Sequence, residues 1–199
     1  RSEETREVLA TALRRRAVIS DFLAVARDTL AAYGVKISAD LYGIMAWGRM
    51  EDLALTGQHV PTFAQLVDVI CPMIYPSHFR PGFEGRARPG DDPEYFIGEG
   101  TRRFVAQVAG QAVIRPWLQA FPYRVSRYDG AYIATQVVAA RALEAVHLLA
   151  VEPDGGIGTD TFKEKEGPLV GSQLRGIQFP PVPGRPVQVA VLELSVALV

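Results

Sequence analysis

Residues 67–79 read Val-Asp-Val-Ile-Cys-Pro-Met-Ile-Tyr-Pro-Ser-His-Phe, and this stretch decides how the rest of the chain is interpreted. Its first half is a short, nearly continuous apolar run, which is typical of a strand buried on both faces of a parallel sheet. Pro76 cannot donate a hydrogen bond to a neighbouring strand, so the strand should end near Tyr75. Ser77 and His78 follow directly. A buried strand with polar and aromatic residues at its carboxyl end predicts a functional edge of the sheet, and the alternative is a plain loop.

The composition is that of an ordinary globular chain, because 48% of the 199 residues are hydrophobic and 22% are charged. One domain of this length can bury a sizeable core. The net charge of −1 gives no reason to expect binding to nucleic acid or to an acidic membrane surface. No apolar stretch reaches the length of a membrane span. The single cysteine, Cys71, lies inside the predicted strand, and we expect it to be a small buried hydrophobe and not a nucleophile.

A second strand is predicted at residues 35–42, where apolar and polar residues alternate. This period of two places Ser38, Asp40 and Tyr42 on one face. If that face lines the interior of a barrel, Asp40 points inward near the carboxyl end of the strand. An isolated carboxylate is costly to bury, so an inward Asp40 needs a partner or a catalytic role. The alternative is an antiparallel sheet with Asp40 in water.

A third strand is predicted at residues 112–121, and its alternation places Arg115, Trp117 and Gln119 on the same face. A sugar site needs such a mixture, because a flat apolar ring packs on the sugar face and polar groups bind hydroxyls or carboxylates. In the alternative interpretation Trp117 fills the core and Arg115 pairs with an acid such as Asp40.

The rest of the chain alternates between helices and strands. Apolar residues at helical spacing predict four helices, at residues 2–33, 60–66, 95–111 and 131–143. A fourth short strand is predicted after the last helix, at residues 146–151. This alternation predicts an α/β fold built from parallel β/α units. The segment 80–93 is rich in glycine and proline, and we expect it to be a long functional loop.

The pattern changes after Glu152, which directly follows the fourth predicted strand. Residues 153–199 do not fit the repeat, and we interpret them as a C-terminal extension. Residues 154–158 are rich in turn-forming glycine, and residues 187–198 alternate in the manner of a terminal strand. An extended tail is the alternative.

The motifs of several other chemistries are missing from the sequence. The glycine-rich segment 154–158 lacks the Gly-Lys-Ser/Thr of a phosphate loop. His59, His78 and His147 are not at the spacing of metal ligands. Ser77 and His78 do not make a catalytic triad, because adjacent side chains are not expected to face each other, and a partner from a distant part of the chain is the open alternative. We therefore expect no metal and no cofactor.

Four motifs stand in order along the chain: residues 38–43 (Ser-Ala-Asp-Leu-Tyr-Gly), 57–58 (Gly-Gln), 67–79, and 114–121 (Ile-Arg-Pro-Trp-Leu-Gln-Ala-Phe). Together they resemble the bacterial "putative glycosyl hydrolase domain", a domain of unknown function among the TIM-barrel hydrolase-like families. The resemblance extends over residues 17–152. The run Pro-Met-Ile-Tyr-Pro-Ser-His is its most specific element.

The resemblance implies that residues 1–152 are the later half of a TIM (β/α)8 barrel. The predicted strands at 35–42, 67–75, 113–120 and 146–151 would then be the fifth to the eighth. The family's fourth strand ends in a motif close to Asp-Tyr-Ile-Arg-Phe-Pro, which this chain lacks. The family's last strand ends in Leu-Trp-Asn or Leu-Trp-Asp, whereas this chain has Leu149-Ala150-Val151-Glu152-Pro153, which keeps an acid and loses the aromatic ring.

The function that the resemblance implies is hydrolysis of a glycosidic bond in a polysaccharide, which requires two carboxyl groups roughly 5–10 Å apart. Asp40 is the candidate for one of them. The candidate substrate-binding residues are Tyr42, Tyr75, Ser77, His78, Arg115, Trp117, Gln119 and Glu152. The resemblance also favours an extracellular or cell-envelope location.

Two other interpretations remain open. A carbohydrate-binding or scaffold barrel would keep the binding residues without catalysis. A half barrel alone would leave open strand edges and an uncovered apolar interior, so it would need an upstream half barrel or self-association.

Overall fold

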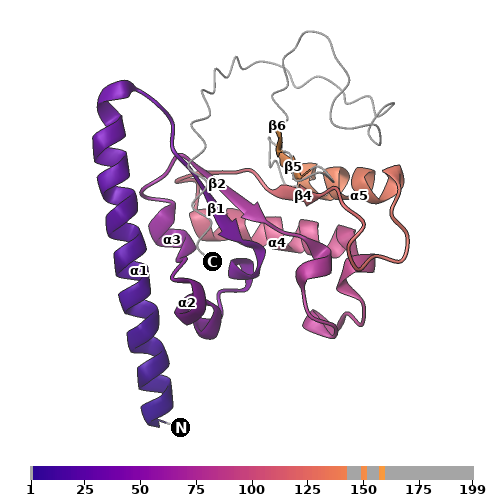
Figure 1. Cartoon of the computed structure of the whole chain (residues 1–199), viewed down its shortest axis with the longest axis horizontal. Coiled ribbons are helices and arrows are strands. Elements are labelled where there is room, and N and C mark those ends of the chain that lie inside the picture. The colour runs from indigo at the N-terminus through magenta and orange to yellow at the C-terminus, as the bar shows by residue number, and fades with distance from the viewer. Residues whose placement is uncertain (1, 143–148, 152–156, 160–199) are drawn as a thin grey trace.

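The computed structural model describes residues 2–142, 149–151 and 157–159 of the chain. Its helices and strands follow in the order α1 (Ser2–Leu30), β1 (Ser38–Tyr42), α2 (Met50–Thr56), α3 (Val60–Phe63), β2 (Val69–Met73), α4 (Pro93–Val108), β3 (Val113–Ile114), β4 (Trp117–Gln119), α5 (Gly130–Arg141), β5 (Leu149–Val151) and β6 (Ile157–Thr159) (Figure 1). Short 3-10 turns lie at η1 (Ala31–Tyr33), η2 (Gly43–Trp47), η3 (Pro76–His78), η4 (Phe83–Gly85) and η5 (Pro89–Asp91).

The strands form one sheet in the order β1-β2-β4-β5-β6, and β3 also pairs with β2. The pairs β1–β2, β2–β3, β2–β4 and β4–β5 are all parallel. The prediction of an α/β fold with parallel strands is therefore confirmed.

Two local predictions differ from the structure. The third predicted strand is divided into β3 and β4, and Pro116 between them has no N–H for a continuous ladder. The turn-rich segment 154–158 was placed outside the β/α repeat, yet β6 begins at Ile157 and pairs antiparallel with β5. The strand predicted at 187–198 lies outside the described residues, as does Glu152.

The register of the parallel strands arranges their residues in rows across the sheet. Asp40 on β1 pairs with Cys71 on β2, and Ile70 pairs with Ile114 on β3. One position further along, Arg115 comes opposite Cys71. Because neighbouring residues on a strand point to opposite faces, this row lies on the face away from Ile70 and Ile114.

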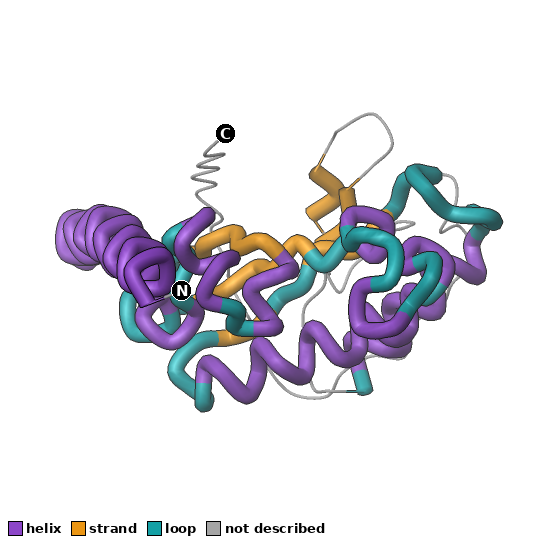
Figure 2. Tube along the Cα trace, turned by 90° about the horizontal axis from the view of Figure 1, so that it is seen from below, coloured by secondary structure: helices purple, strands orange, loops and turns teal. Residues whose placement is uncertain are grey.

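One face of the sheet, which we call the core face, carries Leu41, Ile70, Ile114 and Leu118. These side chains belong to the main hydrophobic cluster, which also includes Phe96 and Phe104 of α4. Figure 2 shows α4 running along this side of the strands. A Cβ atom at Gly100 of α4 would lie 3.0 Å from Ile74 Cδ1, so the glycine lets the helix approach the end of β2 closely.

The other face, which we call the second face, carries Asp40, Cys71, Arg115 and Trp117, as their register and alternation require. Cys71 and Trp117 form a separate small apolar cluster there, with Val69, Met73 and Tyr75 packed against it. The sheet thus has one purely apolar face and one face that mixes charged, aromatic and apolar groups.

The N-terminal helix α1 lies at one end of the sheet, where it packs against α2 (Figure 1). Ala12 and Leu23 of α1 are buried, whereas Val18, Phe22 and Val25 are exposed. None of the helices in the described ranges has the length and apolarity of a membrane span.

Candidate functional site

Asp40 is the acid on the second face, and it has a hydrogen-bond partner there. Trp117 Nε1 donates to Asp40 Oδ1 at 2.9 Å. Because Trp117 lies on β4 and Asp40 on β1, the indole must cross β2, where it contacts Cys71. The side chain of Trp117 is buried and Asp40 is exposed. The alternative of an antiparallel sheet is wrong, because β1 and β2 are parallel, but its expectation that Asp40 is exposed to water agrees with the structure.

Arg115 lies in the same row, on the other side of Cys71. It is only 9% exposed, and its Nε has no hydrogen-bond partner. Its backbone N–H donates to Ile70 O at 2.9 Å, which holds the strand against β2. The sequence alternative in which Arg115 pairs with Asp40 is not what the structure has, because Trp117 takes the carboxylate instead.

Cys71 is influenced by both charged neighbours. Burial, together with the Asp40 carboxylate, raises the pKa of the Cys71 thiol to about 12, while the Arg115 guanidinium opposes the shift. The thiol is free and buried. A thiol with this pKa stays protonated at neutral pH, in agreement with the expectation that Cys71 is no nucleophile.

Four rings at the carboxyl ends of β2 and β4 form a group that we call the aromatic rim: Tyr75, His78, Phe121 and Tyr123. The ring centroids of Tyr75 and His78 are 5.3 Å apart, and those of His78 and Tyr123 are 5.5 Å apart. Phe121 lies 5.4 Å from Tyr75. Tyr123 is 48% exposed, and His78 is exposed as well. The rim therefore offers ring surface to solvent.

Electrostatics connects the rim to Asp40. Burial and, to a smaller extent, the Asp40 carboxylate raise the pKa of Tyr75, so its phenol remains an O–H donor at neutral pH. Burial and the nearby Arg124 guanidinium lower the pKa of His78. His78 is therefore neutral at pH 7 and can act as a hydrogen-bond donor and acceptor.

Gln119 has a supporting position beneath the rim. It is fully buried, and its Nε2 donates to Phe121 O at 3.0 Å and to Tyr123 O at 3.2 Å. Its Oε1 accepts from Ser77 N at 3.1 Å, and Gln136 of α5 binds its backbone. Gln119 thus uses both amide donors to hold the backbone of the rim, and a direct role in sugar binding stays a prediction.

Ser77 is buried in η3, directly below His78. Its Oγ lies 3.3 Å from His78 Nδ1. The expectation that these adjacent side chains would not face each other is therefore wrong, because the tight 3-10 turn brings them to one side. The contact is long for a hydrogen bond between these atoms.

Two loops fix the position of Tyr123. Asp91 of η5 accepts hydrogen bonds from Ser126 N at 2.6 Å and from Ser126 Oγ at 2.7 Å. A Cβ atom at Gly90 would lie 2.2 Å from Arg124 O, so only glycine permits this approach of the loops. The long segment 80–93 therefore acts as a support for the loop that carries Tyr123.

The two remaining predicted residues are Tyr42 and Glu152. Tyr42 ends β1 and is 44% exposed, and its backbone N–H donates to Gln58 Oε1 at 2.8 Å. Glu152 follows β5, whose Val151 pairs with Gln119, but lies itself outside the described residues. The roles of both residues stay predictions.

The structure brings Asp40, Arg115 and Trp117 together on the second face, as the alternation of the strands predicted. Sequence reasoning missed Phe121 and Tyr123 as members of the site. Their position directly after a buried strand was a usable signal, because it is the same signal that selected Tyr75 and His78 after β2.

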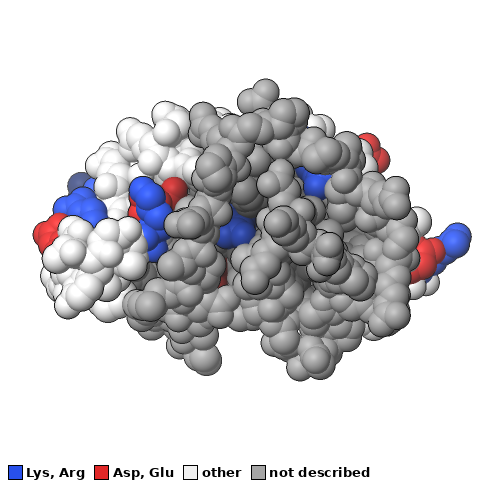
Figure 3. Space-filling view, turned by 90° about the horizontal axis from the view of Figure 1, so that it is seen from above, with Lys and Arg blue, Asp and Glu red and all other residues white. Residues whose placement is uncertain are grey.

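The charge on the surface and the clusters of metal-binding side chains were the two remaining features of interest. Figure 3 shows the charged side chains of the described residues on this view as separate spots of both signs. Within the described ranges, no three His, Cys, Asp or Glu side chains come together as a metal site.

These features define a class of protein: an α/β protein with a parallel sheet that carries polar and aromatic residues at the carboxyl ends of its strands, where ligand sites of such folds lie. A family model described as "Putative glycosyl hydrolase domain" matches residues 2–153. The match extends over more than half of the 199 residues, and the chain belongs to this family. No curated protein and no solved structure matches the chain.

Proposed function

We propose that this chain forms the later half of a (β/α)8 barrel that hydrolyses a glycosidic bond of a polysaccharide. The observation that carries the proposal is the Asp40 carboxylate, held by Trp117 on the second face beside Arg115, with the aromatic rim at the ends of the neighbouring strands. Membership of a glycosyl hydrolase family supports the same reaction type.

Asp40 suits the role of nucleophile or general base. The indole N–H of Trp117 donates to its carboxylate, and a donated hydrogen bond stabilises the ionised form. An ionised carboxylate attacks the anomeric carbon or activates a water molecule, whereas the leaving oxygen must be protonated by a second carboxyl group. Tyr75, with its phenol protonated, is placed to donate a hydrogen bond to a sugar oxygen.

The second carboxyl group must come from another part of the protein. Among the residues of strands β1 to β4, Asp40 is the one acid. Glu152, after β5, is one candidate in this chain, and strands supplied by an upstream half barrel are the other source. In this proposal residues 1–152 are the barrel portion and residues 153–199 an extension, and an extracellular or cell-envelope location follows from the substrate.

Sugar binding in the proposed enzyme would use the aromatic rim. Exposed rings such as Tyr123 pack against the apolar face of a pyranose, while neutral His78 donates or accepts a hydrogen bond. Trp117 is buried and hydrogen-bonded, so its role is to position Asp40 and not to stack on the sugar.

A non-catalytic carbohydrate-binding protein is the second candidate. The specific observation in its favour is that strands β1 to β4 carry a single acid, whereas hydrolysis needs two. Such a protein would keep the aromatic rim and bind polysaccharide without cleaving it.

The test is hydrolysis of a polysaccharide panel by the intact protein, measured as new reducing ends. We expect Asp40→Asn to lower turnover by about 10²–10⁴-fold, the range of a lost acid–base group, while the melting temperature changes little. Trp117 can still donate to the amide oxygen of the new side chain.

The matched control is Asp68→Asn at the start of β2. The Asp68 carboxylate binds Lys36 Nζ at 2.7 Å and Ile37 N at 2.9 Å, away from the carboxyl ends of the strands. This variant should lose stability and keep its turnover while folded. Unchanged turnover in Asp40→Asn removes Asp40 from the mechanism, and polysaccharide binding without any wild-type cleavage selects the non-catalytic candidate.

A further inference from the structure

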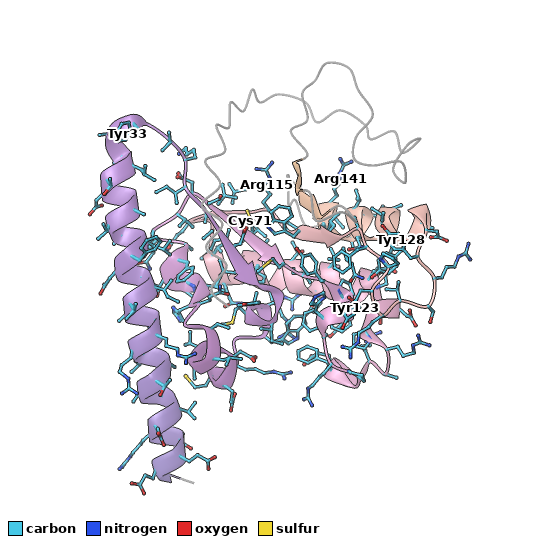
Figure 4. All side chains as sticks on the ribbon, in the orientation of Figure 1. Tyr33, Cys71, Arg115, Tyr123, Tyr128 and Arg141 are labelled. Carbon is cyan, nitrogen blue, oxygen red and sulfur yellow. The ribbon has the colours of Figure 1, made fainter. Side chains whose placement is uncertain are left out.

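Three side chains form one row across neighbouring strands on the second face: Asp40, Cys71 and Arg115. Asp40 pairs with Cys71 in the β1–β2 register. Ile70 pairs with Ile114 in the β2–β3 register, so the next residues, Cys71 and Arg115, are opposite each other. Figure 4 places the side chains of Cys71 and Arg115 close together in the sheet. The row therefore consists of a carboxylate, a protonated thiol and a guanidinium cation.

The two charges of this row do not neutralise each other. Two neighbouring strand spacings separate β1 from the Arg115 strand, which is about 10 Å between backbones. The Asp40 carboxylate instead accepts a hydrogen bond from the Trp117 indole. Arg115 forms no ion pair with any acid of the described residues, and its buried Nε has no acceptor.

An arginine in this environment is costly to the protein. Its side chain is nine-tenths buried, and a buried unpaired charge costs several kcal/mol. By contrast, Arg102 and Arg103 on α4 share Glu99, and Arg86 binds Asp92. Among the arginines of the described residues Arg115 is the buried one, and it lies on the face that carries the candidate catalytic acid.

We propose that Arg115 binds a carboxylate of the substrate, so that the polysaccharide contains uronic acid. Sugar hydroxyls could accept hydrogen bonds from the guanidinium, but only an anion also compensates its charge. The planar fork of arginine matches a carboxylate with two parallel hydrogen bonds. This inference rests on the proposed function, because it names the substrate of the same site.

The experiment measures binding by calorimetry to the intact protein that carries Asp40→Asn, so that ligands are not cleaved. The probes are tetrasaccharides of galacturonate, mannuronate and guluronate, each as the free acid and as the neutral methyl ester. We expect at least one free acid to bind about 10- to 100-fold more tightly than its ester, the gain of a charge-assisted hydrogen-bonded pair.

Arg115→Gln in the same background should remove this preference, so that acid and ester bind equally. Arg115→Lys keeps the positive charge but lacks the planar guanidinium, so it should keep part of the preference for the free acid. Arg102→Gln is the matched control, because Arg102 is exposed on α4 and pairs with Glu99; it should leave the preference unchanged. Far-ultraviolet circular dichroism checks that each variant is folded.

The outcomes separate this inference from the proposed function. Equal binding of acids and esters, or a preference that survives Arg115→Gln, overturns the inference. If Arg115→Gln lowers the melting temperature by several degrees and no acid is preferred, the partner of Arg115 is a carboxylate of the protein itself, and the inference is wrong. Cleavage of a neutral polysaccharide by the wild type without acid preference overturns the inference alone, and failure to bind or cleave any sugar overturns both.

Discussion

The two faces of the sheet carry different kinds of side chain. The core face presents only apolar side chains to α4, where Phe96 and Phe104 are completely buried. The second face places an exposed acid, a buried thiol and an unpaired arginine in one row. Burial of apolar area stabilises the fold without chemistry, whereas charged groups with incomplete pairing cost stability and are retained where a ligand completes them. The comparison teaches that the alternation of the strands separates the side chains that stabilise the fold from those that we propose act in the site.

The aromatic residues repeat this division. Trp47, Phe79, Phe83 and Phe96 pack on one another in the core, with Phe79 and Phe96 stacked at 4.5 Å. Arg49 and Arg103 cover Phe83 and Trp47 from outside. The aromatic rim has similar ring distances, but His78 and Tyr123 are exposed. Arginine side chains thus cover the core rings, whereas two rings of the aromatic rim are exposed to solvent.

The largest effect on this comparison should come from Phe96→Ala on the core side. Phe96 is 0% exposed and contacts four other rings, so its loss leaves a cavity in the centre of the cluster. We expect the free energy of unfolding to fall by about 3–5 kcal/mol in urea titration. A loss below about 1 kcal/mol would mean that the core face does not carry the stability of the fold.

A smaller effect is expected from Trp117→Phe on the second face. The change keeps a ring beside Cys71 and removes the N–H that binds Asp40. The free energy of unfolding should fall by about 1–2 kcal/mol, since one hydrogen bond and some volume are lost. Turnover should fall by tenfold or more as Asp40 loses its orientation. If Trp117→Phe loses as much stability as Phe96→Ala and keeps full turnover, the distinction between the faces is broken.

The smallest effect concerns Glu99 on the solvent side of α4. Hydrogen bonds from Arg102, joined by those from Arg103, lower the pKa of Glu99 to about 2 from 4.5, while burial acts in the opposite direction. A lowered pKa in the folded state stabilises the protein above the unfolded pKa, and this contribution is lost as the pH falls from about 4.5 to 2.

The variant Glu99→Gln tests this contribution. Wild type should lose up to about 1 kcal/mol more than Glu99→Gln over that pH range, because partly exposed ion pairs contribute little. The measurement is urea unfolding at a series of acidic pH values. If the free energy of unfolding depends on pH in the same way in both proteins, the ion pairs of Arg102 and Arg103 with Glu99 add no stability. Paired arginines on α4 would then differ from the buried Arg115 in their surroundings and not in stability gained.

Much of the fold could be predicted from local patterns. The buried run ending at Pro76 predicted β2, and the alternation from Ser38 to Tyr42 predicted β1 and the face of Asp40. Such predictions succeed because the period of side-chain direction is a property of the backbone and needs no knowledge of distant contacts. The division of the third strand followed from Pro116, which the sequence contained but which we did not use.

The sequence by itself therefore determined the positions of β1 and β2, the α/β class with parallel strands and which residues share a face. Only the tertiary structure decided which of these residues meet. It paired Asp40 with Trp117 and not with Arg115, committed Gln119 to the backbone of the rim, and brought Tyr123 beside His78. The physical reason is that these contacts depend on strand register, rotamers and the docking of loops far apart in the chain, and no local period encodes them.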